Sequence, residues 1–161
     1  MTTIGDFMLG GHAACDDLFA QAENAAGDWP RAEGALGVFR DTLLEHIAME
    51  EEVLFPAFED ESGAAQGGPS ETMRAEHQQM RALLEQMADA ARAHDERRYL
   101  GAADTLLMLM QQHNMKEESM MYPMIEAAAG TRADELIAQC RAIELRSAGT
   151  CTCSRHGAAT A

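Results

Sequence analysis

A motif that occurs twice, 67 residues apart, constrains this chain more than any other feature. Residues 46–59, HIAMEEEVLFPAFE, return in register as residues 113–126, HNMKEESMMYPMIE. In each copy a His precedes a Glu by four residues, which places both side chains on one face of a helix. A lone His precedes each copy, His12 by 34 residues and His77 by 36. The chain is therefore predicted to be a duplicated helical hairpin.

Apolar residues recur every three or four positions and predict four long helices joined by mostly short loops. The expected helices span residues 4–26, about 29–56 with a bend or end near Pro56, 70–94 and 97–128, followed by a shorter fifth over 131–145. Asp28 and Ser70 are the predicted capping residues, and the Gly-rich stretch 60–69 is the long connection. These elements predict an all-α, up-down-up-down four-helix bundle in one domain, residues 1–146, with a mobile tail over residues 147–161.

Composition and charge exclude several classes of protein. Hydrophobic residues make up 47% of the chain but aromatic residues only 5%, with 12 Met, which argues against an all-β sandwich. A net charge of -15 repels phosphate backbones and anionic lipids, so nucleic-acid and membrane binding are not expected. We find no transmembrane run and no signal-peptide pattern, and the 4 Cys are too few for a disulfide scaffold. We therefore expect a cytoplasmic protein with reduced thiols.

The lengths of the predicted helices bring the four His to one level. Each of the four helices has about 15 to 17 residues between its His and the hairpin turn, or about 22 to 26 Å at the helical rise. Each His also lies on an inward apolar stripe; on the fourth helix the stripe is Leu106, Met110, His113, Glu117 and Met120. Four imidazoles and two carboxylates are thus predicted to meet inside an apolar bundle, where unpartnered polar groups would cost several kcal/mol.

A metal centre would satisfy all of these groups. The predicted ligands divide into two sets of two His, with two Glu placed to bridge two ions: His12, His46, Glu50, His77, His113 and Glu117. Six ligands are more than one tetrahedral Zn²⁺ takes, so we predict a dinuclear centre, with iron favoured over manganese or zinc. Two divalent ions, two carboxylates and one bridging oxide or hydroxide would leave a small net charge in the core.

The order and spacing of these residues resemble those of the hemerythrin-like proteins, the HHE cation-binding domains, over about residues 5–130. The resemblance implies a four-helix bundle whose non-haem di-iron site binds dioxygen, nitric oxide or peroxide, with Glu50 and Glu117 bridging and the four His as terminal ligands. Two positions differ from the oxygen-carrying members. Met73 stands where they have a second His one turn before His77, and Glu117 lies four residues after His113 where they have an Asp five residues on. The first difference implies an open or water-filled coordination position near Met73.

Other residues are given simpler interpretations. Glu51, Glu52, Glu59, Glu118 and Glu126 are interpreted as a solvated acidic face, Cys15 and the Met stripe as core, and His94 and His156 as exposed. Tyr122 could donate a proton or electron near the site, but the first repeat has Phe55 there, so we interpret it as a structural aromatic. Glu76 is a candidate replacement for the missing imidazole, with water as the other. Cys151 and Cys153 in the tail, with His156, form a weak candidate for oxidation or metal capture.

Three functional hypotheses follow from the predicted site. The first is a binding protein that senses, stores or detoxifies a small diatomic or peroxide ligand, with an unidentified redox or signalling partner. The second is a di-iron oxidoreductase, peroxidase-like, catalase-like or nitric-oxide-reducing, that uses the open position near Met73. The third is a protein whose bound metal serves only to stabilise the fold. We favour the binding protein, because the chain has no flavin or nicotinamide fingerprint for reduction on its own.

Overall fold

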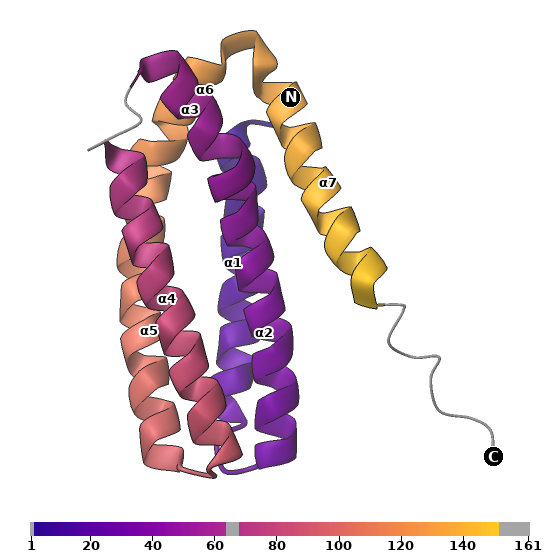
Figure 1. The fold of residues 1–161 in the computed structure, drawn as a ribbon, viewed down its shortest axis with the longest axis vertical. Helices are drawn as coiled ribbons and strands as arrows, with labels where there is room; N and C mark the ends of the chain where they lie inside the picture. The colour runs from indigo at the N-terminus through magenta and orange to yellow at the C-terminus, as the bar shows by residue number, and fades with distance from the viewer. Residues whose placement is uncertain (1, 64–67, 152–161) are drawn as a thin grey trace, which may run out of the picture.

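Four long antiparallel helices form the body of the protein in the computed structural model, which describes residues 2–63 and 68–151. They are α1 (Ile4–Asn24), α2 (Trp29–Met49), α4 (Pro69–Arg92) and α5 (Glu96–Lys116). Helices α1 and α2 pair through one tight turn, and α4 and α5 pair through another at the same end of the bundle (Figure 1). The predicted all-α, up-down-up-down four-helix bundle is confirmed.

At the other end of the bundle, α2 and α5 each continue through one turn of π-helix. The turn after α2 is η1 (Glu50–Leu54), which leads into α3 (Phe55–Ser62); the turn after α5 is η2 (Glu117–Met121), which leads into α6 (Tyr122–Ala129). A π turn takes one residue more than an α turn and is often found at functional sites. The bend predicted near Pro56 is therefore a local widening of a continuous helix rather than its end.

A final helix completes the fold after the short 3₁₀ turn η3 (Gly130–Arg132). Helix α7 (Ala133–Cys151) packs against α1, α2 and η1 through Leu136, Ile137, Cys140 and Ile143, all buried. It extends past the predicted end at Leu145 and the predicted start of the tail at residue 147. Its side chains beyond Glu144, and residues 152–161 with Cys153 and His156, lie outside the described part. The division into residues 1–146 and a tail stays a prediction.

One of the two predicted helix caps is wrong. Asp28 is the N-cap residue of α2, as predicted, although its side chain makes no capping hydrogen bond. Helix α4 begins at Pro69 after Gly68, and Ser70 is instead buried inside its first turn, where its hydroxyl donates to Glu59 Oε1 at 2.6 Å. Ser70 therefore links α4 to α3 through this hydrogen bond and does not cap α4.

The core consists of two apolar clusters with polar residues between them. One cluster fills the half of the bundle near the tight turns and includes Cys15 and Met80; the other lies beneath α3, α6 and α7 and includes Met8 and Met73. His12 lies between Met8 and Cys15 on α1, and His77 lies between Met73 and Met80 on α4. A buried polar layer therefore crosses the bundle between two apolar layers.

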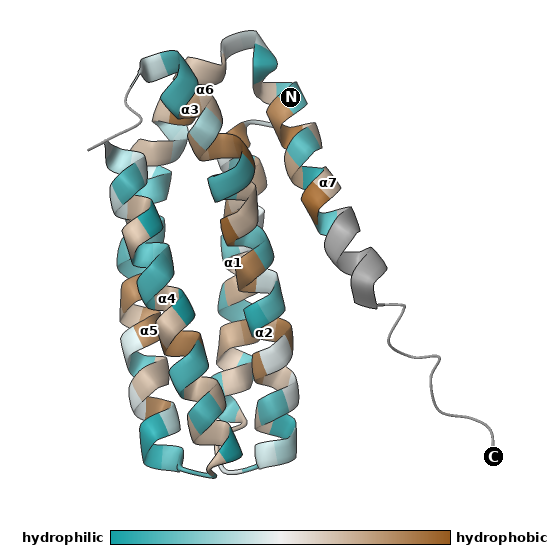
Figure 2. Cartoon of the chain, in the orientation of Figure 1, coloured by the Kyte–Doolittle hydropathy of each residue, from teal (hydrophilic) through white to brown (hydrophobic). Residues whose placement is uncertain are grey.

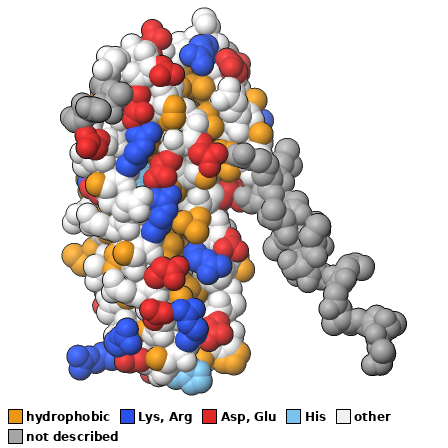
Figure 3. Space-filling view, viewed as in Figure 1, with side chains coloured by type: hydrophobic (Ala, Val, Ile, Leu, Met, Phe, Trp, Pro, Cys, Tyr) orange, Lys and Arg blue, Asp and Glu red, His pale blue; other side chains and the backbone are white. Residues whose placement is uncertain are grey.

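The outer surface fits an amphipathic bundle. Each long helix carries both polar and apolar residues (Figure 2), as expected for helices that bury one face. On the face seen in Figure 3, acidic and basic side chains are interspersed. Within the described residues, no helix combines the length and the apolar character needed to cross a membrane.

Candidate metal centre

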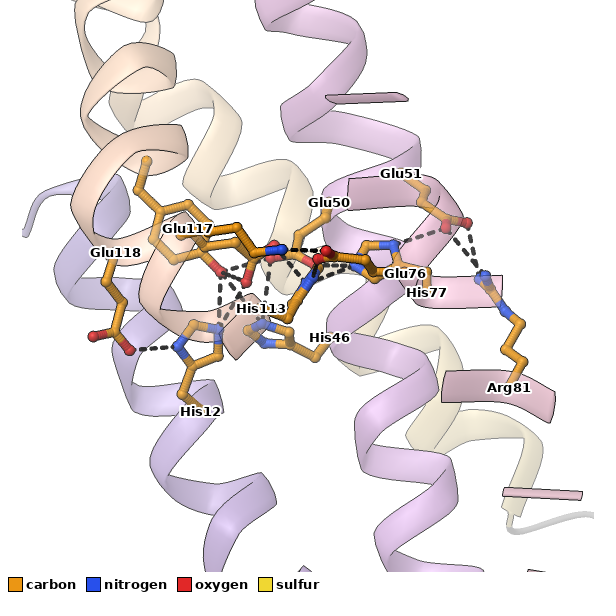
Figure 4. Close-up of polar contacts among 12 residues, drawn as sticks. His12, His46, Glu50, Glu51, Glu76, His77, Arg81, His113, Glu117 and Glu118 are labelled. Carbon is orange, nitrogen blue, oxygen red and sulfur yellow. Dashed lines mark hydrogen bonds and ion pairs between the residues drawn. The ribbon is translucent and has the colours of Figure 1, made fainter. Parts of the chain in front are cut away.

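The polar layer consists of the six predicted site residues. Each long helix supplies one His, and each π turn begins with a Glu: His12 on α1, His46 on α2, His77 on α4, His113 on α5, Glu50 in η1 and Glu117 in η2. All six are at most 6% exposed, and both Glu are completely buried. Figure 4 shows these side chains converging from opposite sides of the bundle. The structure thus brings together every residue that the sequence predicted for the site.

Each carboxylate faces both hairpins. Glu50 Oε1 lies 3.4 Å from His46 Nε2 on its own hairpin, while Oε2 lies 3.2 Å from His77 Nε2 on the other. Glu117 mirrors this arrangement: its Oε1 lies 2.9 Å from His113 Nε2 and its Oε2 lies 3.2 Å from His12 Nε2. One oxygen of each carboxylate therefore points to each side of the site, the arrangement that a bridging ligand needs.

Two overlapping ligand sets result from this arrangement. The His12/His46 half consists of His12, His46, Glu50 and Glu117, and the His77/His113 half consists of His77, His113, Glu50 and Glu117. Within each half, one ligand atom from every residue lies within 4.8 Å of all the others. Imidazole nitrogens and carboxylate oxygens bind first-row metals at about 2.0 to 2.2 Å, so four such atoms can surround one ion. The geometry can therefore hold two ions that share both carboxylates.

Two oxygen atoms show that the site fits a cation. Among the described residues, Glu50 Oε2 and Glu117 Oε1 are the buried side-chain atoms that have no hydrogen-bond partner. His77 Nε2 and His113 Nε2 lie near them, at 3.2 and 2.9 Å, but not in hydrogen-bonding geometry. Leaving a buried charged oxygen unpaired costs more than about 1 to 3 kcal/mol. A bound cation would remove this cost at both atoms.

Three of the four imidazoles also have a carboxylate within hydrogen-bonding distance of Nδ1, the ring nitrogen that is not directed at Glu50 or Glu117. Glu118 Oε1 lies 2.9 Å from His12 Nδ1, Glu51 Oε1 lies 2.9 Å from His77 Nδ1, and Glu76 Oε2 lies 2.8 Å from His113 Nδ1. Such outer carboxylates fix the tautomer and the orientation of a metal-binding His, so that Nε2 faces the metal. The solvated-face interpretation was therefore wrong for Glu51, whose side chain is 22% exposed. Glu118 is solvent-exposed as expected, but its carboxylate also contacts His12.

The acidic partners are themselves held in place. Arg81 donates two hydrogen bonds to Glu51, at 3.1 and 2.8 Å, and Lys116 donates to Glu76. The sequence left Glu76 as a candidate ligand in place of the missing imidazole, but in the structure its carboxylate contacts Nδ1 of His113. A sequence signal was present for two of these residues, since Glu51 and Glu118 directly follow Glu50 and Glu117 in the two copies of the repeat. Glu76 has no equivalent signal.

The carboxylates also change the pKa values of the site. Burial lowers the pKa of His113, but hydrogen bonds and charge from Glu117, with further help from Glu50 and Glu76, outweigh it and raise the pKa to about 9. Burial also lowers the pKa of His12, but hydrogen bonds with Glu117 and Glu118 outweigh it, so the pKa is raised. The pKa of Glu50 is held well below its usual range by His46 and His77, against the effect of burial. The site therefore attracts positive charge, whether protons or metal ions.

Tyr122 lies inside the site, although Phe55 in the first repeat had favoured a structural role for it. Its hydroxyl donates to Glu50 Oε1 at 2.6 Å and lies 3.1 Å from Glu117 Oε2, 3.0 Å from His12 Nε2 and 3.4 Å from His46 Nε2. Burial and the two carboxylate charges raise its pKa well above the usual range, so the hydroxyl keeps its proton. The interpretation of Tyr122 as only a structural aromatic was wrong.

The two halves of the site are therefore not equivalent. The residue that corresponds to Tyr122 in the first repeat is Phe55, whose ring stacks on His77 with centroids 5.8 Å apart. Met73, one turn before His77, is 1% exposed and belongs to the same apolar cluster as Phe55. The His12/His46 half has a hydroxyl among its polar groups, and the His77/His113 half lies against apolar side chains.

Two of the simpler interpretations agree with the structure. Cys15 is 2% exposed within the core, and burial raises the pKa of its thiol to about 12, so it is an unreactive core residue. His94 is exposed in the turn between α4 and α5, where its ring stacks on Trp29.

Fold and site together define a helical-bundle protein with a buried site for cations. The sequence model of the hemerythrin HHE cation-binding domain matches residues 3–146, nearly the whole chain. The chain belongs to this family, as the resemblance in its motifs had indicated. Comparison with curated proteins and with solved structures finds no match.

Proposed function

We propose that the protein holds a carboxylate-bridged pair of iron ions that binds a small ligand, namely dioxygen, nitric oxide or peroxide, for sensing, storage or detoxification. The observation that carries this proposal is the double ligand set, in which two pairs of His share Glu50 and Glu117. Each half offers two imidazoles and two carboxylate oxygens, a mixture that suits non-haem iron. The resemblance to hemerythrin-like proteins favours iron over manganese or zinc.

The bound ions would supply positions for a small ligand and electrons for its reversible reduction. The chain's own residues do the rest of the work. Glu118, Glu51 and Glu76 hold three imidazoles with Nε2 facing inward, and Tyr122 keeps a proton at Oη beside the His12/His46 half. Apolar side chains above and below the polar layer exclude water and favour an uncharged diatomic guest.

A di-iron oxidoreductase is the second candidate function, and two observations favour it. Met73 stands where the oxygen-carrying members of the family have a further imidazole, so an ion in the His77/His113 half would have one protein ligand fewer and a position for a reactant. The Tyr122 hydroxyl holds a proton within 2.6 Å of Glu50 that turnover of peroxide or nitric oxide could use. Such an enzyme would consume its ligand and would need a separate electron donor, here proposed as a redox partner protein.

Elemental analysis, combined with an optical spectrum before and after addition of azide or peroxide, tests the proposal. We expect two irons per chain and a near-ultraviolet charge-transfer band that changes with the ligand. His46→Ala and Glu117→Ala should lower the metal content, whereas His94→Ala, outside the site, should not. Equal metal content in all three variants, or a folded protein that takes up zinc or no metal, would reject the di-iron proposal. Continuous consumption of peroxide in the presence of a reductant would favour the enzyme over the binding protein.

A further inference from the structure

One of the four imidazoles is oriented in a different way from the others. His12, His77 and His113 each have a carboxylate at Nδ1, but no described residue supplies one to His46 (Figure 4). His46 is nevertheless buried, with only 6% of the residue exposed, and its Nε2 lies 3.4 Å from Glu50 Oε1. Something other than a carboxylate must hold this ring in place.

The backbone of α1 at Gly11 lies directly against the ring. A Cβ atom added at Gly11 would stand 2.9 Å from His46 Cε1 and 3.6 Å from Cγ, and nearer still to Nδ1. The approaches to Cε1 and Nδ1 are closer than real Cβ atoms make, so a side chain at position 11 would require the imidazole to shift. The neighbouring Gly10 differs, because a Cβ there would meet nothing within 4 Å.

The two glycines have the same effect on the helix but different surroundings. Each lies inside α1, where Gly is unfavourable relative to Ala because its backbone loses more freedom on folding. Nothing in the structure explains Gly10, whereas the close approach of His46 requires Gly at position 11. This pair therefore provides a matched comparison within a single helix.

We propose that Gly11 is a positioning residue for the metal centre: its missing side chain forms the seat that orients His46, in the role that Glu118, Glu51 and Glu76 have for the other three imidazoles. This inference rests on the proposed two-metal site. With a methyl group at position 11, the ring of His46 must turn away, because α1 is fixed by its buried residues Met8, His12 and Cys15. His46 Nε2 would then leave the His12/His46 half, while the His77/His113 half would keep its ligands.

Metal titration of the full chain tests this proposal. Gly11→Ala and the matched control Gly10→Ala are titrated with Co²⁺ and with anaerobic Fe²⁺, with stoichiometry from calorimetry and elemental analysis. We expect Gly10→Ala to bind two equivalents like the wild type. In Gly11→Ala one equivalent should bind about 10- to 100-fold more weakly, the usual effect of losing an orienting partner. Equal binding by both variants, or equal weakening of both equivalents, would overturn the proposal.

A stability measurement without metal separates this inference from the proposed function. In the wild-type background Gly10→Ala should raise the urea midpoint, and Gly11→Ala should raise it less or lower it. In a His46→Ala background the ring is gone, so both alanines should raise the midpoint by the same amount. If the wild type binds fewer than two metals, the two-metal function fails and this cycle decides whether Gly11 seats His46. A difference between the alanines that persists without His46 would refute the seat.

Discussion

Replacing Tyr122 by Phe tests how a buried hydroxyl stabilises the site before metal binds. The substitution removes the donor 2.6 Å from Glu50 Oε1 and leaves the ring, which is 1% exposed, in place. Glu50 is completely buried and carries a second oxygen without a hydrogen-bond partner. Tyr122→Phe should therefore leave a buried carboxylate with poor compensation for its charge.

The expected magnitude follows from the kind of hydrogen bond that is lost. A hydrogen bond to a charged group contributes about 1.5 to 3 kcal/mol, so the metal-free variant should lose about 2 kcal/mol of unfolding free energy. When a metal is bound, it satisfies Glu50, and the loss should fall below about 1 kcal/mol. The chain contains a matched control in Tyr99, which is fully buried and donates to the backbone carbonyl of Ala22 at 2.8 Å. Tyr99→Phe removes a neutral bond, worth about 1 kcal/mol, and should cost the same with and without metal.

Urea denaturation followed by circular dichroism, with and without saturating metal, provides the assay. For each variant, the loss of unfolding free energy relative to the wild type is compared with and without metal. A metal-free Tyr122→Phe protein as stable as the wild type would refute the reasoning. So would a loss that metal leaves unchanged, as in Tyr99→Phe, because the hydroxyl would then not serve the carboxylate at the site.

Three further predictions concern other parts of the site. Met73→His should restore an imidazole to the His77/His113 half and lengthen the lifetime of the complex with dioxygen; an unchanged autoxidation rate would contradict the open position. Glu51→Gln should weaken binding of the metal in the His77/His113 half about tenfold, because a neutral amide oxygen accepts from His77 Nδ1 more weakly than a carboxylate does. Titration of Glu61→Gln, at an exposed position, provides the baseline. The pKa of His113 is about 9 in the folded protein against 6.5 normally, so its stabilisation is fully present below pH 6.5 and is lost as pH rises through 9. Metal-free protein should lose ~3 kcal/mol over this range, and a flat urea midpoint between pH 6.5 and 9.5 would contradict the shift.

The sequence predicted which six residues meet inside the bundle because their positions depend on regular geometry. The four-residue spacing of His46 and Glu50 places both on one helical face, and equal hairpin legs place His12 level with them. These relations need only the rise and pitch of an α-helix, so all six residues could be found without any tertiary information.

The errors occur where the helix departs from that geometry. A helical wheel with 100° per residue places Met120 on the inward stripe of the fourth predicted helix. In the structure, however, Met120 is 41% exposed and Met121 is completely buried. The π turn adds a residue, so the inward face shifts by one position. For the same reason Tyr122, five residues after Glu117, still reaches it, with Oη 3.1 Å from Oε2. No simple pattern in the residues announces a π turn.

The outer carboxylates were missed for a different reason. Glu51 lies on the π turn after α2, but the imidazole it supports belongs to α4, 26 residues further along the chain. Glu76 supports His113 on another helix, 37 residues away. Such partnerships depend on how helices rotate against each other, which local spacing does not determine.

The two π turns also bear on the ancestry of the chain. Each begins at the Glu that lies four residues after a site His, and they occupy the same register of the repeat, Glu50–Leu54 and Glu117–Met121. If the repeat arose by gene duplication, the extra residue is most simply older than that event, and the ancestor was one hairpin carrying two His, one Glu and the widened turn. Two copies of such a hairpin, paired as a symmetric dimer, would already assemble both ligand sets. Fusion then let the copies diverge, so that one kept Phe55 and the other Tyr122, a difference that no symmetric dimer could carry.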